Sequence, residues 1–142
     1  MLGKDLLCMN DLTPDDIYTI LDTAEVMKRI VKSGNKKTTY LQGKTLVNVF
    51  YENSTRTRLS FELAGKYLGA QVASVSPGGS SVQKGESLLD TLETLRQMGA
   101  DFLVLRHSLE GAPAYIAKHC TASILNAGDG KHAHPTQCLL DL

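Results

Sequence analysis

The stretch TLVNVFYENSTRTR, residues 45–58, decides the fold of this chain. Its first six residues, Thr45–Phe50, are mostly β-branched, apolar or aromatic, and they predict a buried strand. Helical periodicity follows at once over Ser54–Leu68, and Gly69 stands just past its end. The apolar positions of this helix that we expect to face the core are Leu59, Leu63, Ala64 and Leu68.

The same alternation of strand and helix continues along the chain. Further strands are expected over Gln71–Ser76, Asp101–Arg106 and Ala122–Asn126. Helices are expected from Pro14, capped by Thr13, to near Gly34, then over Glu86–Met98, over Ala112–His119 and from Pro135. This order predicts an α/β domain of three layers, with a parallel sheet of about four strands and helices on both faces. Ligands of such sheets bind beyond the carboxyl ends of the strands.

Composition narrows the class of protein. The 142 residues are 42% hydrophobic and 21% charged, which fits one globular domain. Fifteen Lys and Arg balance fifteen Asp and Glu, and aromatic residues are 6%, so neither nucleic acid nor a membrane is an expected partner. No apolar run approaches the roughly 20 residues of a membrane span. Three cysteines without C-x-x-C spacing are typical of reduced thiols, and we expect a cytoplasmic protein.

A candidate anion site follows the first strand. Ser54, Thr55, Arg56 and Thr57 stand where the free N–H groups of a helix start point outward, and arginine adds a forked donor for phosphate oxygens. An ordinary serine cap with a solvated turn is the alternative. The G-x-x-x-x-G-K-[ST] pattern is missing, which disfavours a nucleoside triphosphate.

The other strand ends carry further donors. Arg106 ends the third strand and would reach the same anion, or else form an ion pair with Glu110 or Asp101. After the fourth strand, His134 and Gln137 lie one helical turn apart and can both face the strand ends. The loop before the helix expected over Glu86–Met98 carries Lys84, which could close over an anion, reach a neighbouring subunit or simply be solvated.

Taken together these residues are hydrogen-bond donors and cations, without a visible nucleophile–base pair. Such a set suits binding of a phosphorylated electrophile and stabilisation of charge on its oxygens. His132 and His134 invite a metal interpretation, but a third ligand of suitable spacing is not evident, so neither a metal nor a cofactor is expected.

Two segments resemble the signatures of the carbamoyltransferases. They are Ser54-Thr55-Arg56-Thr57-Arg58 with Ser60-Phe61-Glu62, and His134-Pro135-Thr136-Gln137. Within that family the resemblance is stronger to the enzymes that act on aspartate than to those that act on ornithine. The segments that carry this distinction are Ser80 with residues 82–86, Arg106-His107, and residues 126–130.

The resemblance implies a role for each site residue. Ser54, Thr55, Arg56 and Thr57 would hold the phosphate of carbamoyl phosphate together with Arg106. Thr57, Arg106 and His134 would contact the carbamoyl oxygen, and Gln137 the amino group. Ser80 and Lys84 would serve the site of an adjacent subunit in a catalytic trimer, with regulatory chains as further possible partners. Asn53 stands where many relatives have proline.

The family's catalytic chain is about twice as long as this one, and its second half binds L-aspartate. We therefore interpret residues 1–142 as the carbamoyl-phosphate-binding domain, with the aspartate-binding domain absent and little or no turnover expected from this chain alone. An apolar face left exposed would favour association or a lowered melting temperature. The alternatives are an ornithine or other amine carbamoyltransferase, and a non-catalytic phosphate-binding or assembly module.

Overall fold

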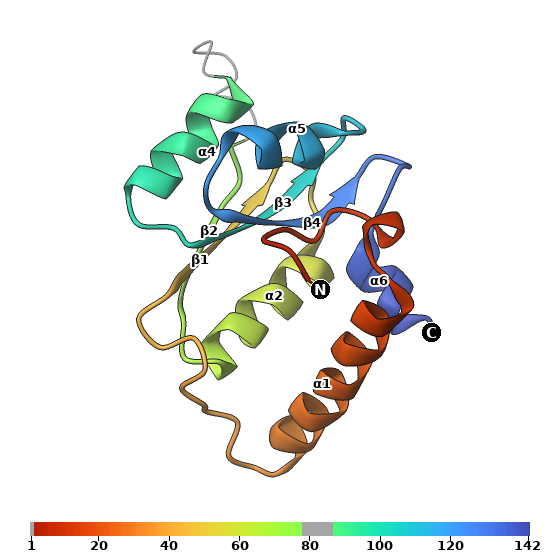
Figure 1. Cartoon of the computed structure of the whole chain (residues 1–142). Coiled ribbons are helices and arrows are strands. Elements are labelled where there is room, and N and C mark those ends of the chain that lie inside the picture. The colour runs from red at the N-terminus through yellow and green to blue at the C-terminus, as the bar shows by residue number, and fades with distance from the viewer. Residues whose placement is uncertain (1, 78–86) are drawn as a thin grey trace.

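A single four-stranded parallel sheet forms the centre of the described structure, in the order β2-β1-β3-β4 (Figure 1). This computed structural model describes residues 2–77 and 87–142. The strands are β1 Thr45–Phe50, β2 Gln71–Val75, β3 Phe102–His107 and β4 Ser123–Asp129. The predicted class of fold is thus confirmed. β4 runs three residues past its expected end at Asn126, because the register shifts after Leu105 and His107 pairs with Asp129.

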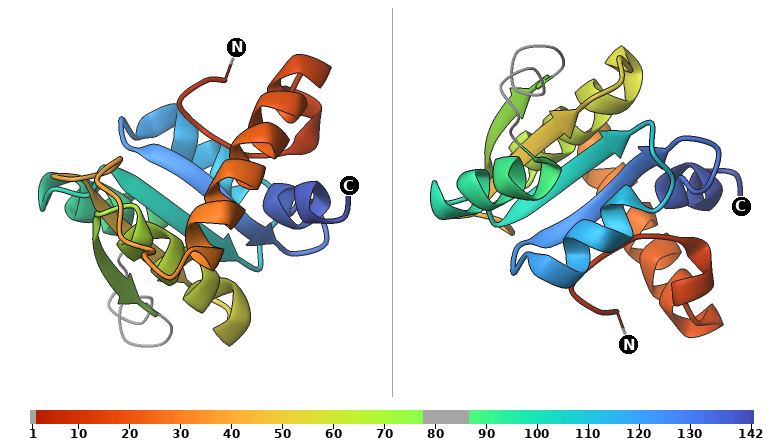
Figure 2. Two further views of the ribbon diagram at one scale, coloured as in Figure 1. Left: turned by 90° about the horizontal axis from the view of Figure 1, so that it is seen from below. Right: turned by 90° about the horizontal axis from the view of Figure 1, so that it is seen from above.

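Helices cover both faces of the sheet, as predicted. The helical segments are a 3-10 turn η1 Met9–Asp11, then α1 Pro14–Lys32, α2 Thr55–Tyr67, α4 Leu88–Gln97, α5 Ala112–His119 and α6 Pro135–Leu140. Figures 1 and 2 show α4 and α5 on one face and α1, α2 and α6 on the other. α1 begins where the sequence predicts, because the side chain of Thr13 accepts the Asp16 N–H and Asp16 accepts the Thr13 N–H in return.

The prediction of which α2 residues face the core is largely wrong. Leu59 and Leu63 are 48% and 37% exposed, and Ala64 is also exposed. Phe61 packs against the apolar cluster of Leu46, Phe50 and Val104 instead. Gly65 decides this face: a Cβ there would lie 2.8 Å from Val72 Cγ2, so the missing side chain lets the helix lie directly on β2. Leucine periodicity does not reveal which small residue permits such a contact.

Leu63 and Ala64 face α1 rather than the sheet. With Met27, Ile30 and Val31 they line an apolar groove of about 450 Å³ between the two helices. The α1 side of this groove is also incompletely buried, since Met27 and Ile30 are half-buried and Val31 is exposed.

The order of the strands fixes where a ligand site can form. The chain passes from β1 to β2 on one side and then to β3 on the other, so the connections diverge between β1 and β3. Ligands of open α/β sheets bind in the crevice at such a switch point. Here the two strand ends are joined directly, since the Tyr51 N–H donates to the Arg106 carbonyl at 2.9 Å.

The segment before η1 adds to the far edge of the sheet, which the sequence does not predict. The Leu6 N–H donates to the Ile124 carbonyl and the Asn126 N–H donates to the Leu6 carbonyl, both at 2.9 Å. This bridge lies beside β4 and supports the strand that leads to His134. In the part of the chain that the structure describes, no helix is long and apolar enough to cross a membrane.

Candidate functional site

The start of α2 follows the end of β1 and presents polar groups at the switch point. Ser54 is the N-cap residue, yet its side chain makes no capping hydrogen bond within the described residues. Thr55 and Arg56 are exposed, and Thr57 is half-buried. The first turn contains no acidic residue, so the partial positive charge of the helix start is not neutralised from within. The turn is exposed, as the alternative of a solvated turn expects, but the Ser54 side chain does not cap the helix, and the free helix start is suited to an anion.

A cavity of about 350 Å³ lies between α2 and α6. Thr57 lines it from α2, and His134 and Gln137 line it from the start of α6. The sequence analysis predicted that these three residues lie together. The remaining lining residues are Ser60, Phe61, Ala64, Thr136 and Leu140. Two segments 80 positions apart in the sequence thus share one hollow at the carboxyl edge of the sheet.

Arg106 reaches this edge from the end of β3. Its Nη1 donates to the Ala127 carbonyl at 2.8 Å, and its Nε lies 3.9 Å from Glu52 Oε2. The Nε atom is buried and has no hydrogen-bond partner among residues 2–77 and 87–142. A buried guanidinium donor that is not satisfied by the protein is poised to bind an anion.

The expected alternative for Arg106, an ion pair with Glu110 or Asp101, is wrong. Asp101 accepts the Thr45 N–H at 2.9 Å, at the opposite end of the strands. Glu52 takes the place of both acids, because β1 and β3 are neighbours and their ends lie side by side. Glu52 and Arg106 are far apart in the sequence, so the sequence analysis did not predict this ion pair.

Arg106 and His134 converge on Gly128. A Cβ at Gly128 would lie 3.0 Å from Arg106 Nη1 and 3.7 Å from His134 Cδ2, and the residue has a φ of +122° that favours glycine. Burial, and then the positive charge of Arg106, lower the pKa of His134. The imidazole is therefore neutral near pH 7 and can act as a hydrogen-bond donor beside a cation.

A second cavity, of about 310 Å³, opens beside the first turn of α2. Glu52, Ser54 and Arg58 line it together with Phe50, Tyr51, Asn53 and Ser76. Arg58 is half-buried, and its carbonyl accepts a 3.4 Å hydrogen bond from the fully buried Asn48 side chain. The sequence analysis singled out neither Asn48 nor Glu52. Asn48 could have been noticed, because it is a polar residue inside an otherwise apolar strand.

Two further residues that the sequence reasoning missed support the loop before His134. Asn126 and Asp129 are each 1% exposed; the Asn126 side chain donates to the Leu7 carbonyl, and the Asp129 carboxylate accepts the Ala133 N–H within that loop. The sequence includes them in the segment 126–130 that carries the family resemblance, but it does not predict their structural role.

Not every predicted residue can be placed. Ser80 and Lys84 lie outside the described residues. Cys120 is buried and Cys138 exposed, and Cys8 lies between these extremes. Among residues 2–77 and 87–142, no group of three or more His, Cys, Asp or Glu is arranged to hold a metal ion.

Comparison with known proteins assigns the family. The family described as aspartate/ornithine carbamoyltransferase, carbamoyl-P binding domain, matches residues 4–142. This chain belongs to that family. The match covers the start of α2, Arg106 and the start of α6.

Curated relatives and solved structures agree with the assignment. The chain is 56% identical over 140 residues to the aspartate carbamoyltransferase catalytic subunit of Ruminiclostridium cellulolyticum, covering 99% of this chain and 45% of that relative. It is 58% identical over 140 residues to the subunit of Acetivibrio thermocellus, with the same coverage. The catalytic subunit of M. jannaschii aspartate transcarbamoylase superposes with a TM-score of 0.91 at 46% identity, covering 99% of this chain and 45% of that one.

A structure of aspartate transcarbamoylase from Trypanosoma cruzi in complex with carbamoyl phosphate and aspartate superposes with a TM-score of 0.89 at 37% identity. It is matched over 98% of this chain and 43% of its own. This carbamoyltransferase domain therefore spans a little under half the length of the relatives it matches.

Proposed function

We propose that residues 1–142 form the carbamoyl-phosphate-binding domain of an aspartate carbamoyltransferase. The whole enzyme would transfer the carbamoyl group to the amino group of L-aspartate, giving N-carbamoyl-L-aspartate and phosphate, as a step of pyrimidine biosynthesis. The names of the relatives support aspartate over ornithine as the acceptor. The aspartate-binding residues would lie in the part of the relatives that this chain does not span.

The convergence of Arg106 and His134 on Gly128, beside the start of α2, carries this proposal. Ser54, Thr55, Arg56 and Thr57 would hold the phosphate through hydroxyl, backbone and guanidinium donors. Arg106 would reach the same phosphate through its buried Nε, which has no hydrogen-bond partner among the described residues. This arrangement uses a helix start and charge-assisted bonds, the two strongest general devices for binding a phosphate.

The carbamoyl group would lie toward α6. The Thr136 hydroxyl lies 3.3 Å from His134 Nδ1 and can donate to it, which leaves the ring proton on Nε2. A neutral His134 would then donate to the carbamoyl oxygen, with Thr57 and Arg106, while Gln137 would bind the amino group.

Catalysis would consist of positioning and charge stabilisation. The amine lone pair attacks the carbamoyl carbon and negative charge builds on its oxygen, where the three donors are aimed. The C–O bond to phosphate then breaks with its electron pair on the oxygen, and the departing phosphate takes up the proton that the amine loses. Holding both substrates in line supplies much of the remaining acceleration, and this chain's residues need no covalent intermediate or cofactor.

Assembly remains part of the proposal. Ser80 and Lys84 would complete the site of an adjacent subunit in a cytoplasmic homotrimer, with regulatory chains as further partners. The family resemblance supports this arrangement.

A chimera tests the proposed function. This chain would replace the matching 140 residues of the Ruminiclostridium cellulolyticum subunit, and carbamoyl-aspartate formation would be measured. His134→Ala should lower kcat about 100-fold with a small change in KM, as loss of one charge-stabilising donor does. The exposed His119 on α5 provides the control His119→Ala, which should leave kcat unchanged. A chimera that assembles and binds phosphate without turnover would favour the non-catalytic module instead.

A further inference from the structure

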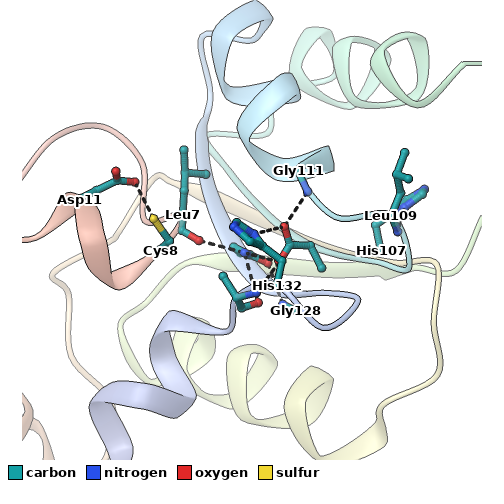
Figure 3. A network of polar contacts seen from close by, with 11 residues as sticks. Leu7, Cys8, Asp11, His107, Leu109, Gly111, Gly128 and His132 are labelled. Carbon is teal, nitrogen blue, oxygen red and sulfur yellow. Dashed lines mark hydrogen bonds and ion pairs between the residues drawn. The ribbon is translucent and has the colours of Figure 1, made fainter.

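The loop that delivers His134 is tied down by one buried carboxylate. Asp129 Oδ2 accepts the Gly111 N–H at 2.9 Å and lies 2.9 Å from His132 Nδ1 (Figure 3). Its Oδ1 accepts the Ala133 N–H at 2.9 Å and a longer bond of 3.3 Å from Asn126. The Asp129 carboxylate thus contacts both sides of the loop, with Ala133 directly preceding His134.

Asn126 extends the same network to the edge of the sheet. Its Nδ2 donates to the Leu7 carbonyl at 2.9 Å, and its Oδ1 accepts the Gly128 N–H at 2.8 Å. Gly128 is the residue on which Arg106 and His134 converge. The network therefore joins the N-terminal segment, the turn at Gly128 and the loop to His134.

The ionisation of Asp129 shows how firmly these donors hold it. Burial raises the pKa of its carboxyl group, but the bonds from Gly111, His132, Asn126 and Ala133 outweigh burial and hold the pKa below its ordinary value. Asp129 is therefore an anion throughout the neutral range. Its location behind the loop keeps it out of the cavity that Thr57, His134 and Gln137 line.

We propose that Asp129 is a positioning residue for His134. Its carboxylate fixes residues 129–133 so that the imidazole is presented beside Arg106, and His132 completes the set of donors. The effect that this inference predicts on ligand binding rests on the proposed function. Phosphate alone would bind at the start of α2, whereas recognition of the carbamoyl group would depend on the position of His134.

The test compares two ligands. Phosphonoacetamide carries a carbamoyl-like amide beside a phosphonate, and inorganic phosphate lacks it, so the ratio of their dissociation constants isolates recognition of the amide. A general loss of stability would weaken both ligands and leave the ratio unchanged. Asp129→Asn should reduce the preference for phosphonoacetamide about tenfold, the size of one lost hydrogen bond to the amide, with a much smaller effect on phosphate.

Asp101→Asn is the matched control. Asp101 also accepts a backbone N–H at 2.9 Å, but at the opposite end of the strands, so this variant should keep the ratio. A second pair avoids the risk that Asp129→Asn fails to fold. His132 is half-exposed, and His132→Ala should reduce the ratio about threefold, as loss of one hydrogen bond does. His132→Asn should restore it, because the amide nitrogen can replace the imidazole Nδ1.

A measurement without ligand separates this inference from the proposed function. The short approach of His134 Cδ2 to Gly128 predicts a nuclear Overhauser contact between the His134 Hδ2 and the Gly128 α protons. That contact should be present in the wild type and lost in Asp129→Asn. If the wild type does not prefer phosphonoacetamide but the contact is lost in the variant, the proposed function fails and the positioning role stands. If Asp129→Asn and His132→Ala keep both the ratio and the contact, the positioning role is overturned.

Discussion

The guanidinium of Arg106 lies between two acceptors, the Ala127 carbonyl of β4 at 2.8 Å and the carboxylate of Glu52, just after β1, at 3.9 Å. The carbonyl contact orients Nη1, whereas the carboxylate faces Nε, which has no hydrogen-bond partner among the described residues. An incoming phosphate must therefore replace Glu52 as the negative charge that faces Nε.

Glu52→Gln should strengthen phosphate binding by this chain about threefold. The substitution removes a competing charge from a partly exposed pair, and such pairs contribute about 0.2–1 kcal/mol. Calorimetric titration with inorganic phosphate measures the effect. Glu25→Gln, at an exposed position on α1, is the control and should change nothing. Unchanged or weaker binding in Glu52→Gln would show that Glu52 does not compete for Arg106.

The pKa of His134 should change with the charge of Arg106 and with the charge of a bound phosphate. Burial and the Arg106 charge lower its pKa in the free chain. Arg106→Ala should raise that pKa, and so should saturating phosphate in the wild type, because each makes the surroundings of the imidazole less positive. The pKa is read from the His134 Cε1 proton resonance as pH is varied. A pKa that does not move in Arg106→Ala would contradict the convergence of the two side chains.

The same depressed pKa has a consequence for stability. The unfolded chain binds a proton at His134 more readily than the folded chain does, so His134 supports folding above the ordinary histidine pKa. This contribution is lost as pH falls through the range between the ordinary and the lowered value.

Gly65→Ala should destabilise the chain by about 1–3 kcal/mol, the usual range for overpacking. The added Cβ would lie 2.8 Å from Val72 Cγ2 and push α2 away from β2. Urea denaturation measures the free energy of unfolding. Gly3→Ala is the control, since a Cβ there meets nothing within 4 Å. Equal stability of Gly65→Ala and wild type would mean that α2 does not lie on the sheet through this residue.

The sequence predicted the elements well because their signals are local. Thr13 and Pro14 mark the start of α1, and the run Thr45–Phe50 coincides with β1. Thr57, Arg106, His134 and Gln137 could be grouped because parallel strands bring their carboxyl ends to one edge. Their roles toward a ligand stay predictions.

What the sequence could not predict depends on contacts between distant segments. Leu59 and Leu63 have helical spacing, but only packing shows that Gly65 and Phe61 face the sheet. Glu52 meets Arg106 across two strands, and Asp129 gains its partners from α5 and from its own loop. The partner of a polar residue at a strand end cannot be predicted from its position in the sequence.

Exposed apolar groups on α1 and α6 should make the chain associate. Leu140 is 76% exposed, and with Ile20, Leu21, Leu139 and Leu142 it lines a hollow of about 640 Å³. Sedimentation should show mass rising with protein concentration, and Leu140→Ser should reduce this rise. Met98→Ser, at a residue 78% exposed beside α4 on the other face of the sheet, should not. A monomer at high concentration would contradict the prediction.

The most direct test of the central claim is a calorimetric titration of this chain with carbamoyl phosphate, alongside Arg56→Ala and the control Arg29→Ala. Arg29 is exposed near the end of α1, and Arg56 is exposed at the start of α2. We predict saturable binding that weakens about tenfold or more in Arg56→Ala, through loss of charge-assisted bonds to the phosphate, and stays unchanged in Arg29→Ala. Binding that is equal in Arg56→Ala and wild type would contradict a phosphate site at the start of α2.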